Sequence, residues 1–480
     1  MVSPPMGWNS WDCFGTTVTE DEVLANAQVM HDQLLAFGWD TIVVDIAWYD
    51  PTARSHGYNE NAPVVLDGYG RQLPAPSRFP SAVDGAGFGP LAAKVHALGL
   101  KFGLHIMRGI PRRAVELDLP IYGTEWTARD VADHDHVCPW NPDNLGLDHD
   151  HPGAQAYYDA QVAQFAEWGV DFVKADDMLA PYHDREITAY ARAIERTRPN
   201  GPTGRNEPSG PSGRKEPGGP SERGGVGRSE PGGPSAVSGP GRTSAASDPS
   251  GTSAASDPGR AGGVSGRGIV LSLSPGTRLS THHLEHLRAN AEMWRISDDL
   301  WDRWEDVHAQ FARLARWAPF QRDGGWADAD MLPLGHIGIR AERGDDRMSR
   351  LTVDEQKTLL TLWVMGRSPL MMGGHLPTTP PETLALLANP ALAELLRSSS
   401  DGREIIREPL DDGELIVWTA QGNGCSYAAL FWTGARPREV TLPAELPAPA
   451  RDLWTGTPTT ERADTVPAHG VRWLELSTPI

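Results

Sequence analysis

Val170-Asp171-Phe172-Val173-Lys174-Ala175-Asp176-Asp177 is a mostly apolar run that ends in two carboxylates, with one lysine just before them. The run predicts a buried strand of a parallel sheet. Such a strand is covered on both faces, so charges at its end need a partner or a function. Because side chains two residues apart share a strand face, Lys174 and Asp176 are predicted to project together, and Asp177 oppositely.

A second segment, Met293-Trp294-Arg295-Ile296-Ser297-Asp298-Asp299, has the same pattern with an arginine as its cation. The same alternation places Arg295, Ser297 and Asp299 on one face and Asp298 on the other. Two carboxylates held near fixed cations and facing one cavity are what retaining glycoside hydrolysis requires. A pair of structural ion pairs at strand ends is the alternative.

Strands alternate with helices over residues 1–400, which we assign to one catalytic domain. Apolar runs predict strands that include 41–48, 101–107, 170–174, 269–274, 325–330 and 369–372. Helical spacing occurs at 19–37, 88–98, 153–168, 184–196, 283–289, 302–317 and 353–364. Eight strands, nearly all separated by helices, predict an α/β fold of the (β/α)8 TIM barrel type. The charged residues above lie at the C-terminal ends of strands, where such barrels place active sites.

Two segments differ from this alternation. Residues 199–267 are rich in Gly, Pro, Ser, Arg and Glu and contain near-repeats, which predicts a disordered insertion that interrupts the barrel. Residues 401–480 contain short alternating runs between Gly/Pro turns. They predict a separate C-terminal antiparallel β-sandwich domain.

The composition narrows the possible partners and compartments. The net charge of −20 argues against nucleic acid and against anionic membrane surfaces. No apolar run is long enough to span a bilayer, and three cysteines are too few for a disulfide scaffold. No signal peptide is visible, so we expect a cytoplasmic protein if Met1 is the true start, and a secreted one if it is not. The sequence specifies no oligomeric state.

The chain has seventeen tryptophans, and several lie beside strand ends or polar loops rather than in helix stripes. Flat aromatic faces suit the C–H faces of sugar rings, whereas filling of a barrel core is the simpler alternative for any single tryptophan. The tryptophans concerned are Trp8, Trp11, Trp48, Trp140, Trp294 and Trp326.

Four motifs, taken in order, resemble those of glycoside hydrolase family 27, the α-galactosidase family. They are Gly7-Trp8-Asn9-Ser10-Trp11, Lys174-Ala175-Asp176, Arg295-Ile296-Ser297-Asp298-Asp299 and Trp326-Ala327-Asp328-Ala329-Asp330-Met331-Leu332. The resemblance covers nearly the whole chain outside residues 199–267. It implies a (β/α)8 barrel followed by a β-sandwich, and a retaining exo-hydrolase that needs no cofactor.

The resemblance also implies roles for individual residues. Asp176 would be the nucleophile that forms a covalent glycosyl-enzyme, and Asp299 the general acid/base. Lys174 and Arg295 would donate hydrogen bonds to sugar hydroxyls and keep the neighbouring carboxylates ionised.

Further residues would form the sugar-binding site of an oligosaccharide or simple glycoside substrate. Asp330 would close the glycone pocket, and the loop at Cys138 and Trp140 resembles a substrate loop. Serines on the fifth strand lie where the family contacts the substituent at the second sugar carbon. The predicted substrate-binding set, besides Lys174 and Arg295, is Trp8, Asp45, Trp48, His105, Arg108, Cys138, Trp140, Ser272, Ser274, Asp330 and Met331.

Two departures from the family pattern bear on the choice of sugar. The family usually has two adjacent aspartates on the second strand, whereas Ile46 follows Asp45 here. His105 stands where the family usually has a tyrosine, and Asp50, His105 or Arg108 are candidates to compensate. We therefore expect cleavage of terminal α-galactosides. The alternatives are β-L-arabinopyranosides, which lack the C6 hydroxymethyl group, and other α-glycosides. A barrel that binds carbohydrate without cleaving it is a more remote alternative.

Two histidine- and aspartate-rich segments are the competing candidates for a functional site. Asp133-His134-Asp135-His136 and Asp148-His149-Asp150-His151 contain metal-ligand side chains. Their spacing matches no firm metal-binding signature, so we predict loop hydrogen bonding or sugar contact and no metal.

Overall fold

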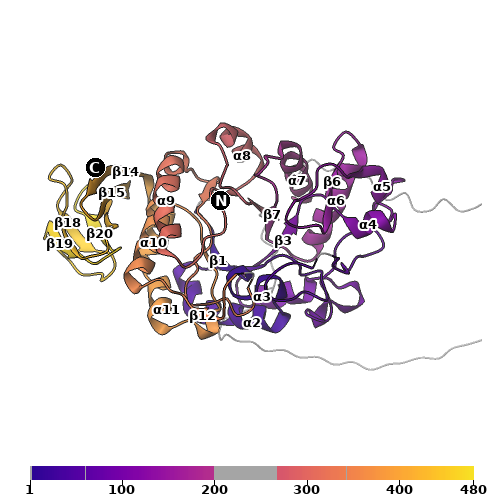
Figure 1. The fold of residues 1–480 in the computed structure, drawn as a ribbon, viewed down its shortest axis with the longest axis horizontal. Coiled ribbons are helices and arrows are strands. Elements are labelled where there is room, and N and C mark those ends of the chain that lie inside the picture. Colours follow the sequence, from indigo (N-terminus) through magenta and orange to yellow (C-terminus); the bar gives the residue numbers. More distant parts are fainter. Residues whose placement is uncertain (1–2, 60, 199–267, 342, 480) are drawn as a thin grey trace, which may run out of the picture. The chain divides into compact units, whose positions relative to one another are not determined.

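A computed structural model describes residues 3–59, 61–198, 268–341 and 343–479, so the predicted insertion at 199–267 lies outside the described residues. Eight parallel strands form one sheet with the order β10-β9-β8-β7-β3-β2-β1-β13, so strands that follow one another in the barrel are neighbours from β1 to β10, and β13 pairs with β1 (Figure 1). These strands are β1 (Met6–Asn9), β2 (Thr41–Val44), β3 (Lys101–Met107), β7 (Phe172–Asp176), β8 (Val270–Leu273), β9 (Met293–Arg295), β10 (Trp326–Asp328) and β13 (Leu370–Met372).

The sheet closes on itself through the segment that follows β10. Leu332 forms a parallel bridge with Met372 of β13, and its N–H donates to the carbonyl of Met371 at 2.8 Å. Because β1 pairs with both β2 and β13, the ring is complete. The predicted (β/α)8 barrel is confirmed.

Helices connect most of the strands, close to the predicted positions. They are α2 (Glu20–Val29), α3 (Gly89–Ala97), α6 (Pro152–Glu167), α7 (Asp184–Thr197), α8 (Leu284–Asn290), α9 (Trp304–Trp317) and α10 (Val353–Met365). The predicted helix over 19–37 is shorter, because α2 passes into a π-helical turn at Met30–Leu34 and a 3₁₀ turn at Leu35–Phe37. Capping boxes begin α2 and α10, since Thr19 pairs with Glu22 and Thr352 with Glu355.

Shorter elements decorate the loops. The helices are α1 (Trp11–Phe14), α4 (Arg112–Glu116), α5 (Ala128–Val131), α11 (Pro381–Leu387) and α12 (Pro390–Ser398). The strands of two small sheets are β4 (Ile110–Pro111), β5 (Ala132–Asp133), β6 (Asn144–Leu147), β11 (His336–Ile337) and β12 (Arg347–Met348).

Strand alternation sorts β7 into two faces. Val173 and Ala175 belong to the large apolar core, which also contains residues of the surrounding helices. Phe172 belongs instead to a separate cluster inside the barrel, with side chains of other barrel strands such as Val43 and Met293. Lys174 and Asp176 share the face of Phe172, so both charges point along the barrel interior toward its C-terminal end.

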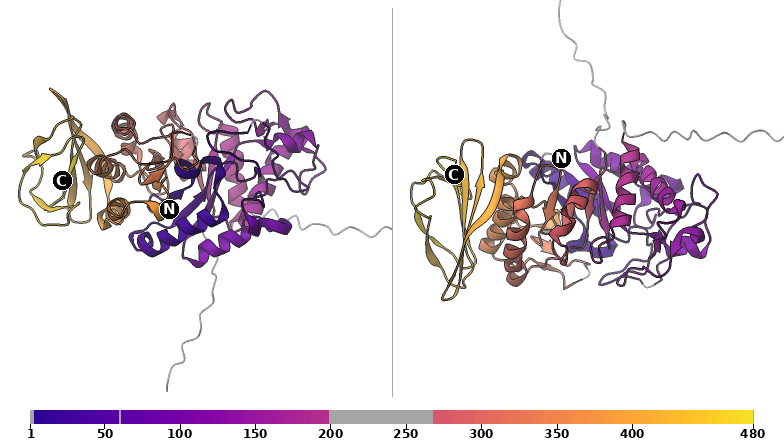
Figure 2. Two further views of the ribbon diagram at one scale, coloured as in Figure 1. Left: turned by 60° about the horizontal axis from the view of Figure 1, so that its bottom comes forward. Right: turned by 90° about the horizontal axis from the view of Figure 1, so that it is seen from above.

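The C-terminal part is an antiparallel β-sandwich, as predicted. One sheet has the order β14 (Ser400–Leu410), β15 (Gly413–Gln421), β16 (Ser426–Trp432), β20 (Val471–Leu476) and β18 (Pro449–Asp452). The second pairs β17 (Arg438–Thr441) with β19 (Ala463–Val466). An apolar cluster that includes Leu430, Val440 and Val466 joins the two sheets. Strands β15, β16 and β20 contact α10 of the barrel. Figure 2 shows the C-terminal strands, in orange to yellow, beside the orange helices of the barrel. Across the described ranges, no helix has the length and apolar character needed to cross a bilayer.

Asn26 joins the first and last helical units of the barrel. Its buried side chain accepts the N–H of Leu376 at 2.8 Å and donates to the carbonyl of Glu22 at 2.8 Å. Asn26→Leu keeps the size of the side chain but leaves the Leu376 N–H without its acceptor. We expect a loss of about 1–3 kcal/mol in the free energy of unfolding, measured by denaturant titration. Gln28→Leu on the exposed face of α2 is the control, and an equal effect of both variants contradicts the assignment.

Candidate active site

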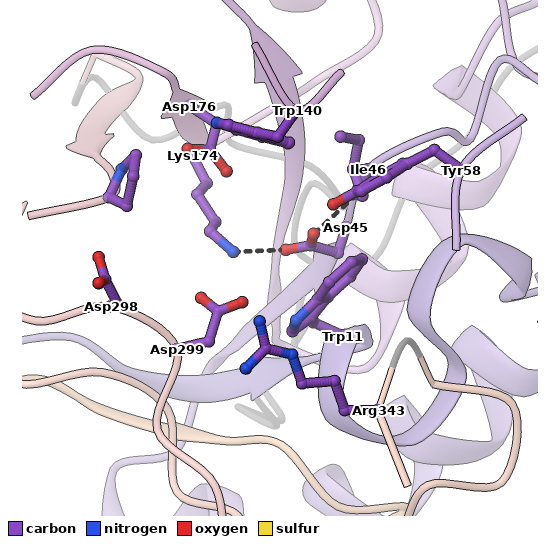
Figure 3. A pocket seen from close by; sticks show the side chains of 11 residues that line it. Trp11, Asp45, Ile46, Tyr58, Trp140, Lys174, Asp176, Asp298, Asp299 and Arg343 are labelled. Carbon is purple, nitrogen blue, oxygen red and sulfur yellow. Dashed lines mark hydrogen bonds and ion pairs between the residues drawn. The ribbon is translucent and has the colours of Figure 1, made fainter. Parts of the chain in front are cut away.

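A cavity of about 310 Å³ lies at the C-terminal ends of the barrel strands (Figure 3). Its walls come from α1, from β7 and from the loops after β2, β5, β8, β9 and β11. The lining residues are Trp11, Asp45, Ile46, Tyr58, Trp140, Lys174, Asp176, Pro275, Asp298, Asp299 and Arg343. The two segments that were predicted to carry the chemistry therefore meet in one cavity.

Lys174 and Asp45 form a buried ion pair at the floor of this cavity. The Lys174 Nζ donates to Asp45 Oδ2 at 2.8 Å, and the side chain of Asn9 donates to the same oxygen at 2.8 Å. Burial disfavours the charged form of both residues, but the opposite charge of the partner favours it more strongly. The charges of Lys174 and His105 hold the pKa of Asp45 well below its usual range, and the charges of Asp45 and Asp176 raise the pKa of Lys174. Both groups are therefore charged at neutral pH.

Each carboxylate oxygen of Asp176 has a hydrogen-bond partner that fixes its orientation. His105 Nε2 lies 3.0 Å from Oδ2, and the N–H of Asp177 donates to Oδ1 at 2.7 Å. Burial raises the pKa of Asp176, but the His105 hydrogen bond and the charges of His105 and Lys174 together lower it below its ordinary value. Figure 3 shows Asp176 and Asp299 turned toward the cavity, with the Lys174 side chain extended between them. Asp176 is thus ionised and aimed at the space that a ligand would fill.

Arg295 holds the opposite wall. Its Nη1 lies 2.8 Å from Asp330 Oδ1, and its Nη2 donates to Asp299 Oδ1 at 3.3 Å. Asp330 is buried, and its second oxygen accepts the N–H of Leu300 at 2.6 Å. Burial raises the pKa of Asp330 to about 7, against the lowering effect of Arg295. The side chain of Asp299 remains 35% exposed, so Asp299 reaches the cavity while Asp330 anchors the arginine from behind.

The alternation argument for Asp299 does not hold in the structure. Strand β9 ends at Arg295, so Asp298 and Asp299 lie in the loop that follows it, and both line the cavity. Asp298 and Asp299 differ instead in their contacts, since Arg295 forms an ion pair with Asp299. For Asp176 the argument applies, because β7 continues to Asp176 and the backbone of Asp177 then turns into the left-handed region, with a φ of 59°.

Arg108 and Cys138 lie behind the C-terminal end of β7 and do not line the cavity. Arg108 Nε lies 2.8 Å from Asp177 Oδ2, and Arg108 Nη1 lies 3.9 Å from Glu186. Burial raises the pKa of Asp177 to about 6 and that of the Cys138 thiol to about 12. These buried groups support the strand end that carries Asp176.

Two of the predicted tryptophans are core residues in the structure. Trp8 is fully buried and donates its indole N–H to the carbonyl of Gly374 at 2.9 Å. Trp48 donates to the carbonyl of His105 at 2.7 Å and packs edge-on against Phe88 and Trp168 in the helix layer. Trp48 therefore fixes the strand that carries His105 instead of facing a ligand.

The remaining predicted residues lie below or beside the cavity. Ser272 pairs with Lys174 in the β7–β8 register, and Ser274 donates its N–H to the carbonyl of Ala175 at 3.0 Å. Both serines are buried. Met331 belongs to the apolar cluster under the cavity that also includes Ile46.

Several cavity residues were not predicted as site residues. Trp11 was noted only as one of several tryptophans, and it stacks on Tyr58 with ring centroids 6.1 Å apart. Tyr58 in turn lies 5.8 Å from Trp140, which completes an aromatic wall. Arg343 comes from a distant loop. No local pattern marks loop residues of this kind, because only the closed barrel brings them together.

Asp12 is a further acidic group that the sequence analysis did not identify. It is buried in α1, and its pKa is raised by burial and by the charges of Asp330 and Asp299. A raised pKa indicates a carboxyl group that holds its proton more readily than an ordinary aspartic acid does.

The two histidine- and aspartate-rich segments line a different hollow of about 310 Å³. Their side chains pair locally, with His136 Nδ1 at 2.7 Å from Asp133 and His149 Nε2 at 3.0 Å from Glu186. Within the described ranges, no group of three or more His, Cys, Asp or Glu side chains is arranged to hold a metal ion. The prediction of a metal-free protein stays a prediction.

Known proteins resemble this chain in sequence and in fold. A family model described as alpha galactosidase A matches residues 259–395. A GH27 β-L-arabinopyranosidase from Geobacillus stearothermophilus is 40% identical, with a TM-score of 0.81, and the match covers 99% of this chain and 96% of that one. A putative alpha-N-acetylgalactosaminidase from Bacillus halodurans is 36% identical, with a TM-score of 0.75 and coverage of 99% and 97%. Alpha-galactosidase 2 from Arabidopsis thaliana is 22% identical over 94% of this chain and 83% of its own length.

Removal of the Lys174 charge leaves the buried Asp45 carboxylate without its main partner. We expect Lys174→Met to lower the free energy of unfolding at pH 7 by about 3–5 kcal/mol. The double variant with Asp45→Asn should recover part of that loss. Lys101→Met is the matched control, because Lys101 lies on barrel strand β3 and its ion pair with Asp40 is exposed. Denaturant titration of the four proteins checks this, and equal losses for Lys174→Met and Lys101→Met contradict it.

Proposed function

The chain belongs to glycoside hydrolase family 27 and is a glycosidase, and on that basis we propose that it removes terminal β-L-arabinopyranosyl units with retention of configuration. The observation that carries the choice of sugar is the apolar side chain of Ile46 in the wall of the cavity, directly after Asp45. The 40% identical relative named as a β-L-arabinopyranosidase supports the same choice.

Ile46 offers no hydrogen bond where the family usually has a second aspartate. Its side chain packs with Trp11, Met107 and Met331 in the apolar cluster under the cavity. A primary hydroxyl placed against this wall would lose water without gaining an acceptor, which costs about 1–3 kcal/mol. β-L-Arabinopyranose is galactose without its C6 hydroxymethyl group, so it avoids that cost.

The first chemical step assigns opposite tasks to the two carboxyl groups. The Asp176 carboxylate attacks the anomeric carbon and forms a C–O bond, while the bond from that carbon to the leaving oxygen breaks. Asp299 gives its proton to that oxygen. In retaining enzymes the two carboxyl groups stand about 5–5.5 Å apart, which leaves no room for a water between them. The hydrogen bond from His105 and the charge of Lys174 keep Asp176 ionised for this attack.

The second step reverses these roles. Asp299, now a carboxylate, takes a proton from a water molecule, whose oxygen attacks the anomeric carbon and releases Asp176. Arg295 contacts Asp299, so its positive charge would stabilise the carboxylate that Asp299 becomes between the two steps. Lys174 and Asp45 face the cavity and are positioned to bind sugar hydroxyls, and the aromatic wall of Trp11, Tyr58 and Trp140 suits a sugar ring face.

Hydrolysis of terminal α-galactosides is the second candidate. It is favoured by the matching family model and by the curated relatives, which are named alpha-galactosidases. Both sugars use the same nucleophile and the same acid/base, so the two candidates differ only in the wall at Ile46.

Azide rescue separates the roles of the two carboxylates. We expect Asp176→Ala and Asp299→Ala each to lose at least about 10²–10⁴-fold in turnover of nitrophenyl β-L-arabinopyranoside. Azide should restore turnover of Asp176→Ala with an inverted glycosyl azide, and that of Asp299→Ala with a retained one, as assigned by NMR. Asp184→Ala, which removes an exposed aspartate at the start of α7, is the control for loss of a carboxylate outside the cavity. Near-native hydrolysis by Asp176→Ala of every glycoside that the parent cleaves would refute the mechanism.

The Ile46 wall sets the preference between the two sugars. We expect the parent to have a higher kcat/KM on nitrophenyl β-L-arabinopyranoside than on nitrophenyl α-galactoside. Ile46→Asp, or Ile46→Ser if the former folds poorly, should shift the ratio toward the galactoside by about 10–100-fold, since it supplies a hydrogen-bond partner for the extra hydroxyl. Ile46→Val should leave the ratio nearly unchanged. A parent that prefers the galactoside refutes the proposed sugar but leaves the glycosidase assignment in place.

A further inference from the structure

The orientation of the nucleophile depends on the peptide group between Asp176 and Asp177. The N–H of this group donates to Oδ1 of Asp176 at 2.7 Å, and the backbone of Asp177 is left-handed, with a φ of 59°. We propose that Arg108 and Asp177 are positioning residues, whose ion pair holds this peptide group and so aims the Asp176 carboxylate, and that the pair requires Asp177 to be ionised. The inference rests on the proposed function, from which it takes the role of Asp176.

Arg108 holds this peptide group from two sides. Its backbone N–H donates to the carbonyl of Asp176, the other end of the same peptide group, at 3.2 Å. Its Nε donates to the carbonyl of Asp177 at 3.0 Å and lies 2.8 Å from Oδ2 of the Asp177 carboxylate. Both side chains are almost fully buried, with exposures of 4% and 1%. One arginine therefore fixes the backbone before and after the N–H that orients the nucleophile.

The left-handed turn at Asp177 needs such contacts. A left-handed backbone is unfavourable for a residue other than glycine, so it persists where its surroundings hold it. Rotation of the peptide group would take the N–H away from Oδ1 of Asp176, while His105 would still hold Oδ2. The carboxylate would then be fixed at one oxygen instead of two. A reacting group that is displaced by about 1 Å lowers a rate by up to about 10²-fold.

Arg108 is itself held from outside the cavity. Its Nη1 donates to the carbonyl of His136 at 3.0 Å and lies 3.9 Å from Glu186, in the first turn of α7. Glu186 accepts the hydroxyl of Tyr158 and lies 3.0 Å from Nε2 of His149. These five residues do not line the catalytic cavity, so they act on a substrate through the nucleophile that they position.

Charged and titratable groups surround Asp177 on several elements. They are Arg108 of the loop after β3, Asp176 of β7 and the Cys138 thiol of the loop after β5, and beyond Arg108 they are His136, His149, His183 and Glu186. Burial raises the pKa of Cys138 to about 12 and lowers that of His183 to about 4, so both groups are uncharged at neutral pH. His136, His149 and Glu186 act on Asp177 through Arg108.

Ionisation of Asp177 controls the strength of the ion pair. Burial raises the pKa of Asp177 to about 6; Arg108 opposes this rise and the charge of Asp176 adds to it. Above that pH the carboxylate attracts Arg108, and as the pH falls through it Asp177 takes up a proton and the pair loses its negative charge. The pKa of Asp176 lies below its ordinary value, so activity falls on the acid side while Asp176 is still ionised.

The pH profile of kcat/KM tests the proposal, because its acid limb reports an ionisation that the free enzyme needs. The substrate is whichever of nitrophenyl β-L-arabinopyranoside and nitrophenyl α-galactoside the parent cleaves. We expect an acid limb near the Asp177 pKa of about 6. Asp177→Asn cannot ionise, so it should lower kcat at pH 7 by about tenfold and move the limb down by at least about one pH unit. KM should change less than about twofold, since Lys174 and Asp45 still bind the sugar.

Variants of Arg108 separate its charge from its geometry. Arg108→Lys keeps the charge but offers a single point of contact, and Asp177 still titrates. We expect a lower kcat with an acid limb close to that of the parent. Arg108→Met should lose more than the lysine variant, because Asp177 is then buried without its partner. If Arg108→Met does not fold, the double variant Arg108→Met/Asp177→Asn replaces it, and its acid limb should match that of Asp177→Asn.

Glu404→Gln is the matched control, since it removes a carboxylate 2.7 Å from Arg407 in the C-terminal sandwich. It should leave kcat and the acid limb unchanged. The proposal alone is overturned if an active parent and Asp177→Asn share the same acid limb, or if Asp177→Asn loses no more activity than Glu404→Gln. A parent that cleaves neither nitrophenyl glycoside overturns the proposed function, and this inference with it.

Discussion

The buried charge of Lys174 is the constraint on which the rest of the site depends. An ammonium group inside a barrel needs carboxylates around it, and here it binds Asp45 directly and interacts with Asp176 and Asp299. Those acids come from three separate strands or strand ends. The lysine therefore links the second, fourth and sixth strands of the barrel electrostatically, and it favours ionised carboxylates in a place where burial alone would favour protonated ones.

The barrel itself could be predicted from sequence because its signals are local and repeated. Apolar runs and helical spacing recur in register with the eight units, and the faces of β7 follow from simple alternation as far as Asp176. The same reasoning failed at Asp298 and Asp299, since alternation ends where β9 ends, at Arg295. A charged residue just past a strand can turn either way, and only the surrounding loops decide its direction.

The tryptophans show where such prediction stops. All four of these tryptophans lie near strand ends or polar loops in the sequence. Trp8 and Trp48 are nevertheless buried in the core, whereas Trp11 and Trp140 line the cavity. The difference lies in partners that are remote in sequence: Gly374 accepts the indole N–H of Trp8, and His105 that of Trp48. No short-range pattern contains that information. Tyr58 lines the cavity from the long loop after β2, where the sequence carries no pattern that marks such a residue.

The closure of the barrel has a consequence for how the enzyme would fail. The segment that seals the ring at Leu332 also carries Asp330, whose backbone adopts a φ of 94° and whose carboxylate holds Arg295. A left-handed backbone at a residue other than glycine costs about 1–3 kcal/mol, so this seam stores strain that its surroundings must offset. Local opening there would release Arg295, and with it Asp299, while the other strands stay paired. Thermal inactivation would then precede global unfolding.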